Sequence, residues 1–183
     1  MAKIFVHIGL PKTATTTLQK QVFTKISNQS LNYLGVFQPR DVKQNNLFRQ
    51  FYKAIHSGDA IENIQELLKV ELNKGINLLI SEEMIILPSE EKGWRDKIEN
   101  LRKIIGAMDY HIIITVREPV NAMFSFFSHK YVTYKKDNKS FEEIATTDKN
   151  MEIYQYKKLF SFIHRKFDKT IKCRKFRKKI NRF

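Results

Sequence analysis

Short apolar runs of strand length alternate along this chain with segments whose apolar residues recur every three to four positions. The apolar runs lie at 3–8, 31–36, 76–81, 111–116 and 170–173. Parallel strands need crossover connections, so strands that alternate with helices predict a parallel sheet covered by helices. The expected fold class is therefore α/β with three layers, in which a central parallel sheet of about four to five strands is flanked by helices.

Helical periodicity fills the intervals between these runs. Helices are predicted at 15–27, 47–57, 61–72, 94–105, 119–131, from 141 onward and at 154–167. Ser140 and Glu143 form a capping-box pattern before the short helix that opens at Phe141. No internal repeat and no Pro/Gly/Ser-rich linker divides the sequence, so residues 1–183 are predicted to form one domain.

The junction between the first strand and the first helix has the chemistry of an anion site. Gly9, Leu10 and Pro11 break the strand, and backbone N–H groups and a helix dipole converge at such a junction. Lys12 adds a full positive charge, and the threonines that follow add hydroxyl donors. The candidate phosphate-binding residues are Pro11, Lys12, Thr13, Ala14, Thr15, Thr16 and Thr17. An ordinary structural turn would need one capping threonine rather than four beside a lysine.

This junction is shorter than the ATP-binding P-loop, whose pattern G-x-x-x-x-G-K-[ST] places a long arch before the lysine. Only Leu10 and Pro11 separate Gly9 from Lys12. The arch that wraps a triphosphate is missing, so the loop suits one terminal phosphate better than a triphosphate chain.

Two further strands of the predicted sheet also end in charged residues. Glu82 and Glu83 follow the strand at 76–81, and Arg117 follows the strand at 111–116. Ligands of open α/β sheets bind outside the carboxyl ends of the strands. These side chains would share one pocket with Lys12 if the two strands flank the first strand.

The segment from Pro11 to Thr17 resembles the 5′-phosphosulfate loop, PK[ST]G[ST][ST], of sulfotransferases that use 3′-phosphoadenosine 5′-phosphosulfate (PAPS). Ala14 stands where that pattern has glycine, and its Cβ disfavours a positive φ. A second stretch is similar to the 3′-phosphate site of the same family, in which an arginine closes a strand and a serine lies eight residues on. Arg117 and Ser125 have that spacing. The alternative for Arg117 is a salt bridge with a carboxylate such as Glu118.

This resemblance covers about residues 3–134 and implies a P-loop NTPase-like fold, in which the strands ending at Glu82 and Arg117 flank the first strand. It implies a sulfotransferase that moves a sulfuryl group from PAPS to a hydroxyl acceptor, leaves adenosine 3′,5′-bisphosphate and needs no metal. A carbohydrate acceptor is favoured by likeness to short bacterial-type members. Members are usually longer than this chain, so an inactive or C-terminally truncated sulfotransferase is an alternative.

Lys12 is the residue expected to stabilise negative charge on the leaving phosphate oxygen. Glu82 is the first choice for the general base, because it follows a buried strand, and Glu83 is the second. His7 and His129 are alternatives, since other members of the family use a histidine. The structural alternatives are a surface helix cap for Glu82 and simple packing for His7.

The formal net charge of +14 favours anionic partners, and much of the excess lies in a basic tail at about 165–183. This tail is a candidate for weak contact with nucleic acid or an anionic membrane, which leaves a basic nucleic-acid-binding protein as one rival interpretation. A P-loop nucleotide or small-molecule kinase is the other.

No apolar run has membrane-span length and no signal peptide is visible, so a cytoplasmic protein is expected, with peripheral membrane contact through the tail as an option. The lone Cys173 forms no intrachain disulfide.

Overall fold

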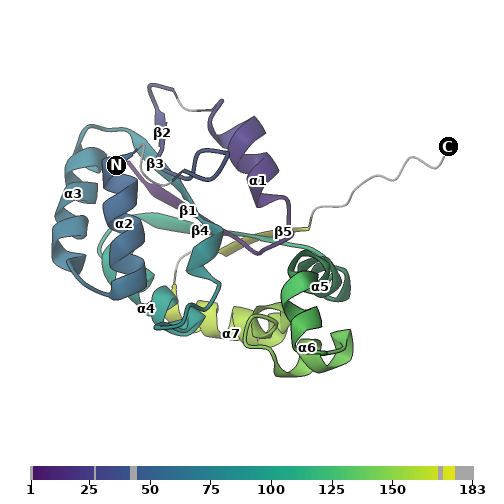
Figure 1. Ribbon diagram of the computed structural model, residues 1–183. Helices are drawn as coiled ribbons and strands as arrows, with labels where there is room; N and C mark the ends of the chain where they lie inside the picture. Colours follow the sequence, from purple (N-terminus) through teal and green to yellow (C-terminus); the bar gives the residue numbers. More distant parts are fainter. Residues whose placement is uncertain (1, 27, 42–44, 169–170, 176–183) are drawn as a thin grey trace.

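The computed structural model describes residues 2–26, 28–41, 45–168 and 171–175, the last range in its backbone only. Its centre is a five-stranded sheet in the order β2-β3-β1-β4-β5, with every pairing parallel (Figure 1). The strands are β1 (Ile4–Gly9), β2 (Leu31–Tyr33), β3 (Asn77–Ser81), β4 (Tyr110–Val116) and β5 (Ile171–Lys175). The predicted α/β class is confirmed, and β3 and β4 flank β1 as expected.

The helices follow the predicted order, with differences at their ends. They are α1 (Thr15–Leu18), α2 (Asn46–Ser57), α3 (Ile61–Asn73), α4 (Trp94–Ile105), α5 (Pro119–Lys136), α6 (Phe141–Thr147) and α7 (Tyr156–Lys166). Three shorter pieces complete the set: the π-helical η1 (Gln19–Phe23) and the 3₁₀ turns η2 (Glu83–Ile85) and η3 (Glu152–Tyr154). Ser140 and Glu143 form the capping box predicted for α6.

Two predicted elements are shorter in the structure than in the sequence pattern. The first helix ends at Phe23 after its π-helical turn, and the strand predicted at 31–36 ends at Tyr33. The Tyr33 hydroxyl donates to the Val36 carbonyl at 2.9 Å. Beyond Tyr33 the backbone still runs beside β3, because the Leu34 and Val36 N–H groups donate to the Leu79 and Ser81 carbonyls at 2.8 and 3.5 Å. In contrast, α5 is longer than predicted and reaches Lys136.

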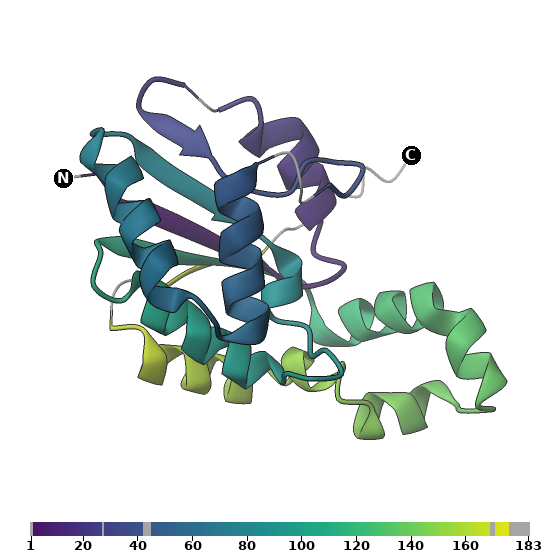
Figure 2. The same ribbon diagram turned by 60° about the vertical axis from the view of Figure 1, so that its left-hand side comes forward.

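The two faces of the sheet are covered differently. Alternate residues of β1, namely Ile4, Val6 and Ile8, are fully buried in a core shared with α2, α3, α4 and α7, which contact one another as a layer (Figure 2). The opposite face carries Phe5 and His7, and there Phe23 of η1 packs edge-on against the His7 ring. Both faces are thus covered near the carboxyl ends of the strands.

Across the described ranges, none of the helices combines the length and the apolar character that crossing a bilayer would require. The last predicted strand is present as β5, whereas most of the basic tail at 165–183 lies outside the described residues.

Candidate functional site

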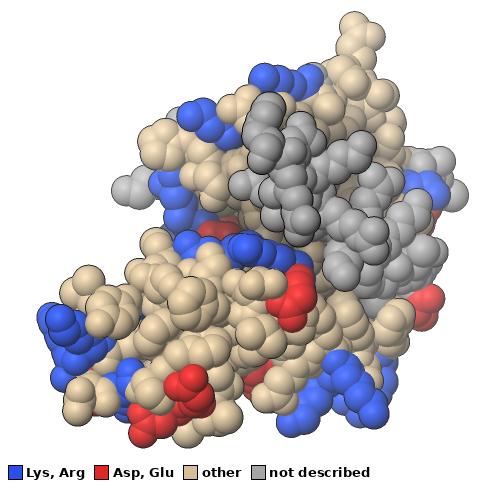
Figure 3. Space-filling view, turned by 90° about the vertical axis from the view of Figure 1, so that its right-hand side faces the viewer, with Lys and Arg blue, Asp and Glu red and all other residues tan. Residues whose placement is uncertain are grey.

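A cavity of about 620 Å³ opens at the carboxyl ends of the central strands. Its walls come from the loop after β1, the segment after β3, helix α5 and the chain near Asn150. The lining residues are Pro11, Lys12, Ala14, Thr15, Thr16, Glu83, Met84, Leu87, Pro88, Ser125, Phe126, His129, Lys130 and Asn150. Figure 3 shows a hollow on this side of the molecule, with lysine or arginine side chains along its edge.

The loop after β1 contains two residues in the left-handed conformation. Lys12 has φ 64° and Ala14 has φ 69°, whereas Thr13 between them does not have a positive φ. The Cβ of Ala14 was expected to disfavour this conformation, and the structure adopts it nonetheless, at a cost of roughly 1–2 kcal/mol relative to glycine. Alternation of this kind turns successive N–H groups toward one side and forms an anion-binding concavity.

Thr15 combines burial with an unused hydroxyl. The residue is 2% exposed, and its Oγ1 has no hydrogen-bond partner within the described part of the chain. A Cβ added at Gly9 would lie 2.0 Å from this oxygen, so β1 ends in glycine because Thr15 packs directly on its Cα. An unpaired buried hydroxyl is costly, and a ligand oxygen in the cavity would satisfy it.

Of the other three threonines of the predicted loop, the exposed Thr16 also lines the cavity, whereas Thr13 and Thr17 do not. Thr13 is buried, donates from Oγ1 to the Leu10 carbonyl at 2.6 Å and lies 2.9 Å from the Thr115 hydroxyl of β4. Thr17 is exposed on α1. Neither is among the described residues that line the cavity, so Thr13 holds the loop and Thr17 faces away from it.

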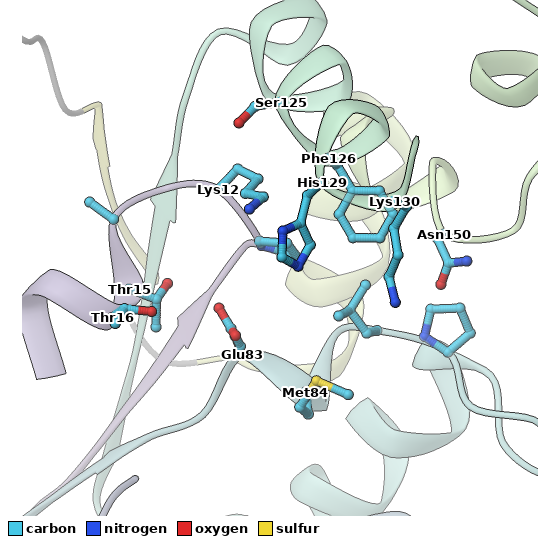
Figure 4. A pocket seen from close by; sticks show the side chains of 14 residues that line it. Lys12, Thr15, Thr16, Glu83, Met84, Ser125, Phe126, His129, Lys130 and Asn150 are labelled. Atoms are coloured by element: carbon cyan, nitrogen blue, oxygen red, sulfur yellow. The ribbon is translucent and has the colours of Figure 1, made fainter. Parts of the chain in front are cut away.

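Helix α5 supplies one wall of the cavity. Ser125 and His129 are four residues apart and therefore share one face of the helix, as do Phe126 and Lys130. Figure 4 shows the Lys12 side chain below Ser125, with His129 and Lys130 projecting from the same helix toward Glu83 and Met84. Lys130 and Asn150 were missed in the sequence; helical spacing from Ser125 leads to His129 rather than to Lys130, and nothing in the pattern indicated Asn150.

The two candidate carboxylates are placed differently, and Glu82 is not among the described residues that line the cavity. Glu82 is 1% exposed, and Arg40 binds both of its oxygens at 3.0 and 2.9 Å. Its Oε1 also accepts from the Met84 N–H at 2.7 Å, so Glu82 does cap η2, but as a buried residue. Burial raises the pKa of the Glu82 carboxyl, and Arg40 opposes that rise.

Glu83 is the carboxylate that lines the cavity (Figure 4). Burial raises the pKa of the Glu83 carboxyl above its ordinary value, while the positive charges of Arg40 and Lys12 hold it down. A half-buried carboxylate with a raised pKa beside a cationic loop has the character of a general base.

Arg117 is exposed, and its side chain is not among the described residues that line the cavity. Its backbone adjoins the loop, because Thr115 of β4 pairs with Gly9 of β1. The carbonyl of Arg117 accepts a 2.6 Å hydrogen bond from the Tyr156 hydroxyl. The neighbouring Glu118 caps α5 by accepting from the Val120 and Asn121 N–H groups. The structure thus brings Ser125 to Lys12 and leaves the Arg117 guanidinium outside.

His7 does not reach the cavity. It is fully buried on β1, between the hydroxyls of Ser81 and Thr115, and burial lowers its pKa to about 4. It is therefore a neutral member of an internal hydrogen-bond chain and is excluded as the base. The described residues contain no group of three His, Cys, Asp or Glu side chains that could hold a metal ion.

A scan of the chain against models of protein families finds no match. A search of the curated proteins finds none either. Function is therefore argued from the site itself.

Proposed function

We propose that this protein is a sulfotransferase that moves a sulfuryl group from PAPS to a hydroxyl acceptor, with a carbohydrate as the favoured class. The observation that carries the proposal is the shared cavity, which is lined by Lys12 from the loop after β1, Ser125 from α5 and Glu83 after β3. These residues are distant in sequence, and each has a separate role in the proposed reaction.

The loop after β1 fits the 5′-phosphate end of such a donor. Its left-handed residues at Lys12 and Ala14 turn backbone N–H groups to one side, and the unpaired Thr15 hydroxyl offers one more donor. Ser125 is proposed to bind the 3′-phosphate from within the cavity. Arg117 is proposed to reach the same phosphate from outside, since a guanidinium provides a fork of donors for phosphate oxygens.

PAPS would supply the activated sulfuryl group that passes to the acceptor. The protein's own contribution is electrostatic and acid–base chemistry. Lys12 stabilises the negative charge that grows on the leaving phosphate oxygen, and removal of such a charge costs about 3 kcal/mol or more in the barrier. Glu83 accepts the proton of the acceptor hydroxyl, and His129 is the second candidate for that step because it lines the same cavity.

The acceptor is proposed to occupy the part of the cavity between η2 and α5. Met84, Leu87 and Phe126 provide apolar surface there, and Lys130 and Asn150 provide hydrogen-bond donors. A mixture of flat apolar surface with a few polar groups is suited to a sugar ring and its hydroxyls.

Calorimetric titration with adenosine 3′,5′-bisphosphate, compared with ATP plus Mg²⁺, tests the proposal. We expect the bisphosphate to bind more tightly and Lys12→Ala to reduce both its affinity and the turnover of PAPS. Lys20→Ala, which changes an exposed lysine of η1 outside the cavity, is the matched control. Preference for ATP plus Mg²⁺ would support a kinase instead. Near-normal turnover in Lys12→Ala would refute the role of the lysine.

A further inference from the structure

A chain of hydrogen bonds crosses the sheet beneath the cavity, and His7 stands in the middle of it. On one side, Gln38 Nε2 donates to Gln19 Oε1 at 2.6 Å, Gln19 Nε2 lies 3.2 Å from Ser81 Oγ, and Ser81 Oγ lies 2.9 Å from His7 Nδ1. On the other side, His7 Nε2 lies 3.2 Å from Thr115 Oγ1, which lies 2.9 Å from Thr13 Oγ1, and Thr13 Oγ1 lies 2.6 Å from the Leu10 carbonyl. The chain joins β3, β1 and β4 to the loop that carries Lys12.

The direction of the bonds can be worked out from the Leu10 end. A carbonyl only accepts, so Thr13 uses its single hydroxyl proton on Leu10. Thr13 must then accept from Thr115, which uses the only hydroxyl proton of Thr115. Thr115 must therefore accept from His7, which requires a proton on His7 Nε2.

The Ser81 end is compatible with the same tautomer. Gln19 Nε2 lies 3.3 Å from the Ser81 carbonyl, and this fixes the side-chain amide of Gln19 as the donor. The same NH₂ group donates to Ser81 Oγ, whose own proton has two acceptors in reach, His7 Nδ1 and the Tyr33 hydroxyl. The Leu10 end places the single proton of a neutral ring on Nε2, which leaves Nδ1 to accept from Ser81. His7 Nδ1 is therefore the acceptor, and a neutral imidazole with one donor and one acceptor satisfies both neighbours. Burial lowers the pKa of His7 to about 4, which agrees with a neutral ring at pH 7.

We infer that His7, held as the Nε2–H tautomer, is a positioning residue that orients Thr115 and thereby fixes the loop around Lys12. This inference deepens the proposed function and rests on it for its catalytic meaning. Thr13 closes the turn by bonding Leu10 through both its hydroxyl and its N–H, at 2.6 and 3.3 Å, and Lys12 lies within that turn with φ 64°. Left-handed non-glycine residues persist only where their surroundings hold them. The hydrogen bonds from His7 on β1 through Thr115 on β4 to Thr13 keep this turn in place.

The tautomer is measured by long-range ¹H–¹⁵N correlation spectra of the ¹⁵N-labelled protein at pH 7. The chain has five histidines, and the signals that disappear in His7→Gln identify His7. We expect a protonated Nε2 and an unprotonated Nδ1. A protonated Nδ1 or a rapid average of the two tautomers would overturn the inference, whatever the protein binds.

The positioning role is measured by calorimetry with adenosine 3′,5′-bisphosphate. Thr115→Val keeps the shape of the side chain but can neither accept from His7 nor donate to Thr13, and we expect its affinity to fall roughly tenfold, as for the loss of a buried hydrogen bond. Thr115→Ser keeps the hydroxyl and should bind within about twofold of the unchanged protein, since only a methyl group is lost. Equal affinities in the two variants would overturn the role of the chain.

Ser81→Ala provides a second variant in case Thr115→Val does not fold. It removes the donor to His7 Nδ1 and leaves the Leu10–Thr13–Thr115 half intact, so the Nε2–H tautomer should persist and the affinity should change less than tenfold. A protonated Nδ1 in Ser81→Ala would contradict the derivation from the Leu10 end. If the unchanged protein fails to bind the bisphosphate, the proposed function fails, and the tautomer spectra still decide the hydrogen-bond chain.

Discussion

Glu83→Gln is the substitution that separates the two adjacent carboxylates most sharply. Glu83 lines the cavity with Lys12, whereas Glu82 is buried against Arg40 outside it. The amide keeps the size of the side chain and removes its capacity to accept a proton. Loss of a general base lowers turnover by about 10²- to 10⁴-fold, and we expect kcat for sulfuryl transfer to fall within that range.

The pH dependence gives the sign of the effect. Burial raises the pKa of Glu83, and a base must be ionised to act, so kcat/KM should rise with pH through a value above the ordinary pKa of a glutamate. That acidic limb should disappear in Glu83→Gln. A carboxyl whose pKa is raised on folding destabilises the protein as pH rises through that pKa. The free energy of unfolding should therefore fall between acidic and neutral pH in the unchanged protein, and it should fall less in Glu83→Gln.

The assay is the initial rate of PAPS turnover over pH 4 to 9, with denaturant unfolding measured in parallel. Glu82→Gln is the matched control because it makes the same change one residue away, outside the cavity, and it should retain the acidic limb. If Glu83→Gln kept both its rate and its pH profile, the assignment of the base would be refuted. Attention would then pass to His129, which lines the same cavity.

Three further predictions concern the frame of the site. Ala14→Gly should raise the free energy of unfolding by about 1 kcal/mol, because glycine adopts φ 69° without the Cβ strain; a lower free energy in urea denaturation would show that the loop is not strained. Gly9→Ala should destabilise the protein by roughly 1–3 kcal/mol, because the new Cβ would lie 2.0 Å from Thr15 Oγ1, and an unchanged melting temperature would contradict this overlap. The Lys97 ammonium is buried against the Met84 carbonyl, and this burial lowers its pKa to about 8. The free energy of unfolding should therefore rise between pH 8 and 10.5 relative to that of Lys97→Met. Parallel plots of unfolding free energy against pH for the two proteins would refute this.

The architecture was predictable because its signals are local. Each buried strand is a continuous apolar run. Helices α2 and α4 end at Gly58 and Gly106, and these glycines mark the helix ends in the sequence. The strand predicted at 31–36 was too long, since β2 ends at Tyr33, although the Leu34 and Val36 N–H groups still donate to carbonyls of β3.

The candidate site was predictable in outline and not in detail. The loop motif located Lys12, and the eight-residue spacing from Arg117 located Ser125, because both depend on short-range sequence order. The choice between Glu82 and Glu83 depended on Arg40, which lies about forty residues away in the sequence and whose pairing no local pattern reveals. Likewise, no local pattern indicated that His7 would lie between two hydroxyls of neighbouring strands.

Helix α5 has a consequence for how such a protein can diversify. This helix carries both Ser125, which is proposed to bind the donor nucleotide, and Lys130, which is proposed to bind the acceptor. The two residues lie little more than one helical turn apart. A mutation that tilts or rotates this helix to admit a new acceptor would displace the nucleotide contact as well. Changes of acceptor preference should therefore arise through side chains of the η2 segment on the opposite wall, leaving the helix where it is.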